Sequence, residues 1–338
     1  MAKITKSTTD RKKDHIELAM LSQTPINQVD PRFYYEPVLS NHPTDQEIQA
    51  TAFGSKNLSY PIWVSSMTGG TEMAKLINKN LARACREFGL GFGLGSCRKL
   101  IDNPESFSDF DVKEIIGPDL PFYANLGVAQ VEQWFQNAQQ DKLKKIVDLL
   151  RADGLIIHIN PLQEYMQAEG DRFKYKPIDT IKKVLDHFAF PVIVKEVGQG
   201  MGPASLKALL ELPLQAIEFG AFGGTNFSIL EMQRQHGDEV QALLPLTKVG
   251  HTAEQMVDYC NEIYETAKIH CKQLIISGGV NHFLDGYYLI QKSKIPAVYG
   301  QASSFLKYAQ ADYESLRTFV KSQIRGLNLA YSFLKIKI

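Results

Sequence analysis

The sequence predicts a (β/α)8 barrel, a TIM barrel, with an N-terminal extension. Short apolar runs recur along the 338 residues, and longer segments with helical spacing separate them. The runs are apolar almost throughout rather than alternating, which is typical of parallel strands buried on both faces. Glycines follow several of the runs, as expected where a barrel builds its site from many strand ends. An open doubly wound sheet, the main rival, would show one glycine fingerprint after its first strand.

Eight apolar runs provide the expected strands. They span residues 61–67, 89–96, 121–127, 154–160, 191–198, 216–223, 273–279 and 296–302. Helices are expected between them, as in residues 141–150, where apolar side chains recur at i, i+3, i+4 and i+7. Another helix is predicted after Thr252, whose side chain suits the position before a helix. We assign residues 1–50 to an arm and extension that packs on the barrel, and residues 51–338 to the barrel itself.

The composition argues against some classes of partner. Lysine plus arginine equals aspartate plus glutamate at 37 each, so no overall field attracts nucleic acid or an anionic membrane. No apolar run could span a bilayer, and the N-terminus lacks the apolar core of a secretion signal. The cysteines Cys85, Cys97, Cys260 and Cys271 have neither metal-ligand nor redox spacing. We therefore expect a cytoplasmic protein with reduced thiols that binds a small molecule, not nucleic acid or a membrane.

Small residues at the ends of the last two predicted strands indicate a phosphate site. Gly278, Gly279, Gly300 and Ala302 would let backbone N–H groups approach an anion closely. In barrels of this type, the loops after strands seven and eight commonly bind phosphate. Tight turns also use glycine, but both loops carry small residues together, which favours a phosphate.

Two other strand ends carry polar residues within apolar runs. Lys195 could be a cation beside the electron-accepting edge of a cofactor, a Schiff-base lysine or an ion-paired lysine. Ser65, Ser66 and Thr68 could bond the edge of a heteroaromatic ring, with Met67 packed beneath it. A capping turn before the next helix explains these hydroxyls equally well.

The stretch HINPLQE gathers four polar side chains at the end of the fourth predicted strand. His158 and Asn160 are two apart and face the same side, while Gln163 and Glu164 follow on the loop. Buried without partners, such groups would cost roughly 1–3 kcal/mol each, so a ligand explains them better. Glu164 has no second acidic residue beside it, and could hold Mg²⁺ only if substrate phosphates supplied the other oxygens.

A basic cluster lies outside the predicted barrel. Arg11 and Lys12 could close over a phosphate, in this subunit or in a neighbour's. Spacing alone favours a solvated basic arm.

These stretches together match a known pattern. From Arg11 to about Phe305 the chain contains, in order, RK..H, MTGG, GxGS.R, NLG, H.NPLQE, VKEVG.GM, GGTNF and SGG. This set resembles the type 2, FMN-dependent isopentenyl-diphosphate delta-isomerases over nearly the whole chain. HINPLQE and VKEVGQGM are highly specific in combination, whereas GGT and SGG are generic to flavin barrels.

The resemblance implies a barrel that binds FMN and interconverts isopentenyl and dimethylallyl diphosphate, with Mg²⁺ and with NADPH to reduce the flavin. It implies FMN contacts from Ser66, Met67, Thr68, Ser96, Asn125, Lys195, Thr225, Gly278, Gly279 and Ala302. It implies diphosphate contacts from Arg11, Lys12, Ser96, Arg98, His158 and Asn160. Gln163 would lie beside the reacting carbons, Glu164 would bind Mg²⁺, and Gln163, His158 and Lys195 would form the catalytic set. We also expect a homo-oligomer.

The implied reaction moves an unactivated double bond. It adds a proton at one carbon and removes one from another, through an intermediate close to a tertiary carbocation. Ordinary pKa tuning makes none of these side chains acidic enough, so the cofactor would carry the hard step. Reduced FMN would exchange protons and stabilise positive charge with no net redox change, while the diphosphate orients the alkene.

The sequence departs from the family pattern at three places. Cys97 stands where glutamine is common, Asn281 where arginine is, and His251 lies in a Gly-His-Thr that replaces Gly-Ile-Pro-Thr. The change at Asn281 removes a candidate cation for a phosphate. Two alternatives stay open: an FMN-dependent α-hydroxy-acid or nucleotide dehydrogenase on the same barrel, and a non-catalytic paralogue that binds flavin or diphosphate.

Overall fold

A closed barrel of eight parallel strands forms the centre of the computed structural model, which describes residues 8–43, 48, 50–66, 72–234 and 241–337. Each strand pairs with the next along the chain, and the last pairs with the first. The strands are β4 (Ile62–Val64), β5 (Gly91–Gly93), β6 (Phe122–Gly127), β7 (Gly154–Ile159), β8 (Val192–Glu196), β9 (Ala216–Glu218), β10 (Leu274–Ser277) and β11 (Ala297–Gln301). The (β/α)8 prediction is confirmed, and each predicted strand contains one of these.

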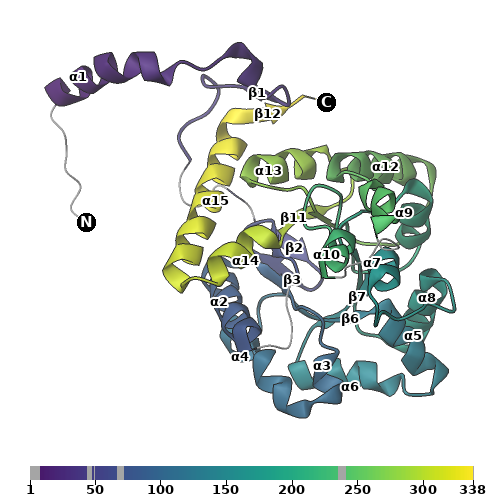
Figure 1. The fold of residues 1–338 in the computed structure, drawn as a ribbon. Coiled ribbons are helices and arrows are strands. Elements are labelled where there is room, and N and C mark those ends of the chain that lie inside the picture. The colour runs from purple at the N-terminus through teal and green to yellow at the C-terminus, as the bar shows by residue number, and fades with distance from the viewer. Residues whose placement is uncertain (1–7, 44–47, 49, 67–71, 235–240, 338) are drawn as a thin grey trace.

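Helices surround the barrel (Figure 1). They are α2 (Glu72–Phe88), α3 (Lys99–Asp102), α4 (Lys113–Ile116), α5 (Val128–Gln136), α6 (Asp141–Leu150), α7 (Pro161–Met166), α8 (Pro177–His187), α9 (Pro203–Leu210), α10 (Phe227–Arg234), α12 (Ala253–Thr266), α13 (Phe283–Lys292), α14 (Ser303–Ala309) and α15 (Tyr313–Phe333). The helix predicted at 141–150 is α6, which buries its four periodic residues. Thr252 caps α12, as predicted, by accepting a hydrogen bond from the backbone N–H of Gln255. Among the described residues, no helix is long and apolar enough to cross a membrane.

The barrel interior is filled in layers, because side chains alternate along each strand. The lower layer is apolar and consists of Trp63, Tyr123, Ile156, Ile193, Ala216, Ile275 and Val298. The hairpin β2 (Thr51–Phe53) and β3 (Lys56–Leu58) adds Phe53 and Leu58 to this layer. Two positions further along their strands, the inward residues are polar: Ser65, Asn125, His158, Lys195, Glu218 and Ser277. A polar floor therefore lies near the carboxyl ends of the strands.

The N-terminal extension attaches to one side of the barrel. Its strand β1 (Phe33–Tyr35) pairs with β12 (Leu334–Ile336), and Arg32 forms an ion pair with Asp285 of α13 at 2.9 Å. The helix α1 (Thr8–Ala19) stands apart from the barrel in Figure 1. Apolar side chains on and just after α1 are exposed, including Ile16 at 78%.

Candidate functional site

The polar floor of the barrel centres on Lys195. This lysine is 7% exposed, and its Nζ donates a hydrogen bond to the Glu196 carbonyl at 2.8 Å. Glu218 lies beside it in register on the neighbouring strand β9 and is fully buried. Burial raises the pKa of Glu218, and the nearby charge of Lys195 opposes that rise. In the described part of the chain, no carboxylate lies within ion-pair distance of Lys195, so its charge is free to face a ligand.

Several buried polar atoms of this floor have no partner. The hydroxyls of Ser65 and Ser66 and one carboxylate oxygen of Glu218 make no hydrogen bond within the structure's described residues. Each belongs to a residue that lines a polar cavity at the barrel mouth, together with Lys195 and Thr225. Unpaired buried polar atoms are costly, so they indicate a polar ligand at this place.

The phosphate cradle predicted at the ends of strands seven and eight lines the same cavity. Gly278 and Gly279 have positive φ angles of 87° and 70°, and a side chain at Gly278 would collide with the Ala221 backbone. The cavity has a volume of about 70 Å³, room for about two waters, so a larger ligand would extend from it into the open mouth. Ala302, which the sequence analysis predicted as part of the phosphate site, also lines the cavity. Ser303 and Ser304 line it too, although the sequence analysis did not single them out.

Asn281 offers this cradle no cation, and the start of α13 is already capped. The backbone N–H groups of Asn281 and His282 both donate to the Asp285 carboxylate, at 3.0 and 3.3 Å. The other oxygen of Asp285 is held by Arg32. The glycine loop and the serines near Ala302 therefore remain as the donors for an anion.

Three of the four polar residues of HINPLQE, namely Asn160, Gln163 and Glu164, are joined by hydrogen bonds at the end of β7, whereas His158 bonds to the neighbouring strand β6. The Nδ1 of His158 is 2.9 Å from the side-chain oxygen of Asn125, whose amide nitrogen donates to the Leu94 carbonyl. The Asn125 oxygen is therefore the acceptor, which places the imidazole proton on Nδ1. Burial, with a contribution from the Lys195 charge, lowers the pKa of His158 to about 3. His158 is thus neutral at physiological pH.

Asn160 orients Gln163 and Glu164, which lie on α7. Its amide nitrogen donates to Gln163 at 3.2 Å and to Glu164 at 2.9 Å, while its buried oxygen has no partner within the described chain. The second oxygen of Glu164 accepts a hydrogen bond from the backbone N–H of Asp171 at 2.8 Å. These contacts fix the orientation of the Glu164 carboxylate on α7.

Glu231 is a candidate that the sequence did not reveal. This carboxylate on α10 is buried and accepts a hydrogen bond from the Gln163 amide at 3.2 Å. Its other oxygen accepts from Arg234 at 2.8 Å. Glu231 therefore holds the orientation of Gln163 from the adjacent helix α10.

The remaining predicted residues do not all lie near the barrel mouth. Arg98 is half exposed and pairs with Asp171 at 3.0 Å, which links it to the Glu164 network. Ser96 is exposed next to it, and Met67 and Thr68 lie outside the described residues. Arg11 and Lys12 are exposed on α1, which the structure does not bring to the barrel mouth (Figure 1).

Two observations bear on whether protein side chains alone could hold a metal and whether Cys97 could act as a nucleophile. Within the described ranges, no group of three histidine, cysteine or acidic side chains could hold a metal, so Glu164 would need oxygens from a substrate. Burial raises the pKa of Cys97 to about 12, and Cys97 is completely buried. A thiolate nucleophile of the nucleotide-dehydrogenase kind is therefore disfavoured.

Two curated proteins with similar sequences carry the same enzyme name. No family model matches the chain. The isopentenyl-diphosphate delta-isomerase of Rickettsia africae is 31% identical over 324 residues, covering 95% of this chain and 92% of its own. The protein of the same name from Deinococcus radiodurans is 34% identical over 282 residues, covering 83% of this chain and 79% of its own.

Solved structures of flavin proteins share the fold. A mandelate oxidase variant carrying an FMN adduct superposes with a TM-score of 0.56 at 12% identity, covering 91% of this chain and 88% of its own. The flavin-binding domain of baker's yeast flavocytochrome b2 gives a TM-score of 0.62 at 10% identity, covering 88% of this chain and 71% of its own. At such low identity, these likenesses establish the barrel fold alone.

Proposed function

This chain belongs to the isopentenyl-diphosphate delta-isomerase family, and we propose that it interconverts isopentenyl and dimethylallyl diphosphate with reduced FMN bound at its barrel mouth. One observation carries the flavin-dependent form of this activity. A buried lysine and the unpaired oxygens of Ser65, Ser66 and Glu218 face one cavity, beside the clustered residues of HINPLQE. The first group suits a polar ring edge, and the second suits a diphosphate ester.

The residues present fit FMN. Lys195 would lie beside the ring and favour the anionic reduced form, with Ser66 and Thr225 of the same cavity near the ring edge. Asn125 does not line this cavity and would act through His158, to which it is hydrogen-bonded. Gly278, Gly279 and Ala302 would hold the phosphate through backbone N–H groups, with the hydroxyls of Ser303 and Ser304 in place of a cation. When bound, reduced FMN supplies proton exchange and an electron-rich face for a developing positive charge. NADPH is the proposed reductant, needed only to prime the flavin.

The other half of the site would hold the substrate. His158, Asn160, Ser96 and Arg98 would contact the diphosphate, whose oxygens would complete a Mg²⁺ site on Glu164. The Asn160 oxygen, which has no partner among the described residues, would suit a water or hydroxyl donor, since its amide nitrogen is already turned to Glu164. Gln163 would lie against the reacting carbons, positioned by Glu231. The bound diphosphate would thereby orient the alkene without contacting the reacting bond.

Hydroxy-acid oxidation is the second candidate, because the structural neighbours include a mandelate oxidase. Such a reaction needs a base to accept a proton from the substrate. With its pKa lowered to about 3, His158 is a weak base for that purpose. The curated relatives are named isopentenyl-diphosphate delta-isomerase, so the isomerase proposal is better supported.

The proposed function is tested by turnover. FMN-loaded protein, reduced with NADPH under anaerobic conditions, is incubated with isopentenyl diphosphate and Mg²⁺, and the dimethylallyl product is measured. We expect product only when the flavin is reduced, with no net consumption of NADPH during turnover. Oxidation of mandelate or lactate without isomerase activity would instead establish the second candidate.

The basic arm would complete the diphosphate site. Since α1 stands apart from the barrel, Arg11 and Lys12 reach a diphosphate only if the arm closes or comes from a second copy in the proposed homo-oligomer. Arg11→Ala is expected to raise KM about tenfold with little change in kcat, because a charge-assisted contact to the diphosphate is lost. Steady-state kinetics with reduced flavin would measure both constants.

Lys13→Ala is the matched control for this prediction. Lys13 is an exposed cation on the same helix and pairs with Glu17 at 3.7 Å. Its loss should leave KM within about twofold of the parent value. An unchanged KM for Arg11→Ala would return the arm to a solvated basic segment.

A further inference from the structure

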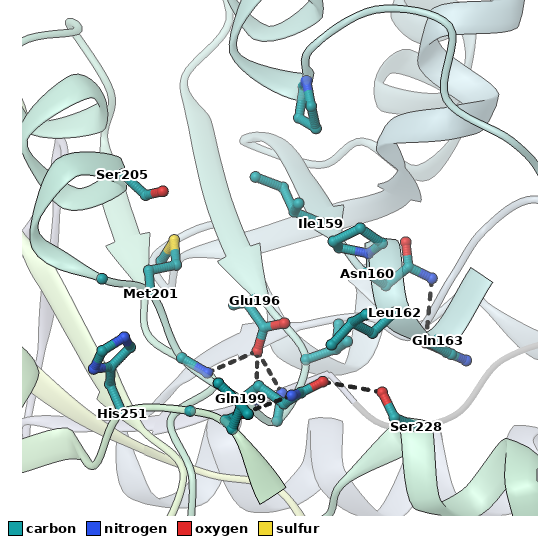
Figure 2. A pocket seen from close by; sticks show the side chains of 18 of the residues that line it. Ile159, Asn160, Leu162, Gln163, Glu196, Gln199, Met201, Ser205, Ser228 and His251 are labelled. Carbon is teal, nitrogen blue, oxygen red and sulfur yellow. Dashed lines mark hydrogen bonds between the residues drawn. The ribbon is translucent and has the colours of Figure 1, made fainter. Parts of the chain in front are cut away.

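A second, larger cavity lies beside the barrel mouth, with residues of α8 and α9 among its lining. Figure 2 shows it from close by. Its volume is about 790 Å³, which is within the range of sites for drug-sized ligands. Ile178 and Ile181 of α8 line one side, and Ala204 and Ala208 of α9 line the other. Lys195, Ser66 and the glycine cradle do not line it, so it is distinct from the proposed flavin cavity.

The walls of this side pocket suit an uncharged chain. Among the described residues that line it, only Lys176 and Glu196 carry a formal charge at neutral pH, and Lys176 is exposed. One oxygen of Glu196 accepts three backbone hydrogen bonds, from Gly198, Gln199 and Gly200, at 2.7 to 3.0 Å. Figure 2 shows this carboxylate turned toward the loop of residues 198–200. Asn160, His251 and Ser205 also line the pocket, but most of its exposed wall is apolar, which suits a hydrocarbon better than an anion.

The pocket exists because α9 presents small side chains to it. Ala204 and Ala208 are one helical turn apart and lie on the same face, while Leu206 and Leu210 are buried on another face. A leucine at either alanine position would occupy part of the space. The volume is therefore a feature of this sequence that a single substitution can remove.

The side pocket adjoins the barrel mouth. Asn160 and Gln163 line it, and Val197, Gly198 and Phe227 line both cavities. Asn160 is 3% exposed, and its side-chain oxygen has no partner among the described residues. A molecule held at the mouth by a charged head group could therefore extend an apolar chain between α8 and α9.

We propose that this side pocket binds the hydrocarbon chain of prenyl diphosphates longer than the five-carbon substrate, with their diphosphate held at the barrel mouth. The five-carbon substrate is too short to fill the pocket, whereas a fifteen-carbon chain adds ten carbons of buried apolar surface. Because the head groups share one site, the longer compound competes with isopentenyl diphosphate and inhibits the enzyme. This inference rests on the proposed function for the placement of the head group.

The test compares farnesyl diphosphate, a fifteen-carbon probe, with dimethylallyl diphosphate. Their dissociation constants are measured by titration calorimetry on FMN-loaded protein with Mg²⁺, without turnover. We expect the fifteen-carbon compound to bind at least about tenfold more tightly than the five-carbon one. Ala208→Phe should remove that advantage by filling the pocket, while leaving the affinity for dimethylallyl diphosphate and the isomerase rate unchanged.

Lys207→Phe is the matched control, because Lys207 is an exposed neighbour on α9 that does not line the pocket. It should keep the preference for the longer chain. Ala204→Phe provides a second pocket variant if Ala208→Phe does not fold, as judged by circular dichroism. The proposal is overturned if a folded pocket variant still prefers farnesyl diphosphate over dimethylallyl diphosphate. It is also overturned if Lys207→Phe loses that preference to the same extent, or if a pocket variant loses affinity equally for the five-carbon compound. Chain-dependent binding without isomerase turnover would instead count against the proposed function alone.

Discussion

Lys195→Ala is expected to lower kcat by about 10²- to 10³-fold and to weaken FMN binding enough that the protein purifies with little flavin. Lys195 is buried in the polar floor, and in the described chain no carboxylate neutralises it by direct pairing. Its loss removes the charge that would hold the reduced flavin in its anionic form. The measurements are flavin absorbance during titration with FMN and the isomerase rate at saturating FMN.

Two controls separate this charge effect from a packing effect. Lys195→Arg keeps the positive charge with a different shape, so it should recover part of the FMN affinity and little of the rate. Lys56→Ala removes another partly buried lysine, which lies on the hairpin at the opposite end of the barrel and pairs with Asp153 at 2.5 Å. It should lower stability and leave FMN affinity unchanged. A colourless Lys195→Ala protein with full activity would refute the flavin assignment.

The barrel could be predicted from the sequence because parallel strands buried on both faces give continuous apolar runs. The same signal overestimates strand length. The run at 89–96 contains a strand of only Gly91–Gly93, and the run at 216–223 contains Ala216–Glu218. Most residues beyond each strand are also buried, such as Leu94 and Phe219, although Ser96 and Gly223 are exposed. Apolar character reports burial, whereas a strand requires backbone pairing as well.

The period-two rule explains why part of the site was predictable. It puts Lys195 on the same inward face as Ile193, and a charge within that apolar run is unusual. The expectation that His158 and Asn160 face the same side stays a prediction, because His158 bonds to Asn125 and Asn160 to residues of α7. Glu218 carried the same signal, a charged residue within an apolar run, and could have been found by it. Glu231 could not, because its contact with Gln163 joins residues 68 apart and depends on how α10 meets α7. The position of α1 likewise depends on tertiary packing that no local pattern encodes.

Glu164→Gln is expected to lower kcat by at least about 10²-fold and to abolish the Mg²⁺ dependence of diphosphate binding. Glu164 would be the protein's carboxylate ligand to Mg²⁺, and an amide oxygen is a much weaker ligand for a hard cation. The amide also suits its neighbours poorly, because both Glu164 oxygens now accept hydrogen bonds, from Asn160 and from the Asp171 backbone. A glutamine places its NH₂ group against one of these donors. Binding of inorganic pyrophosphate with and without Mg²⁺, measured by calorimetry, isolates the metal effect from catalysis.

Glu169→Gln is the control for this substitution, since Glu169 is an exposed carboxylate on the same loop whose ion pair with Arg234 is also exposed. It makes the same change in net charge near the mouth without touching Asn160 or the Asp171 backbone. We expect its Mg²⁺ dependence to equal that of the parent protein, because exposed pairs contribute little. If Glu164→Gln kept the Mg²⁺ dependence of pyrophosphate binding, the metal would be held by the diphosphate and water alone. Glu164 would then act only by orienting Asn160 and the loop at Asp171, and its loss would raise KM without changing the metal requirement.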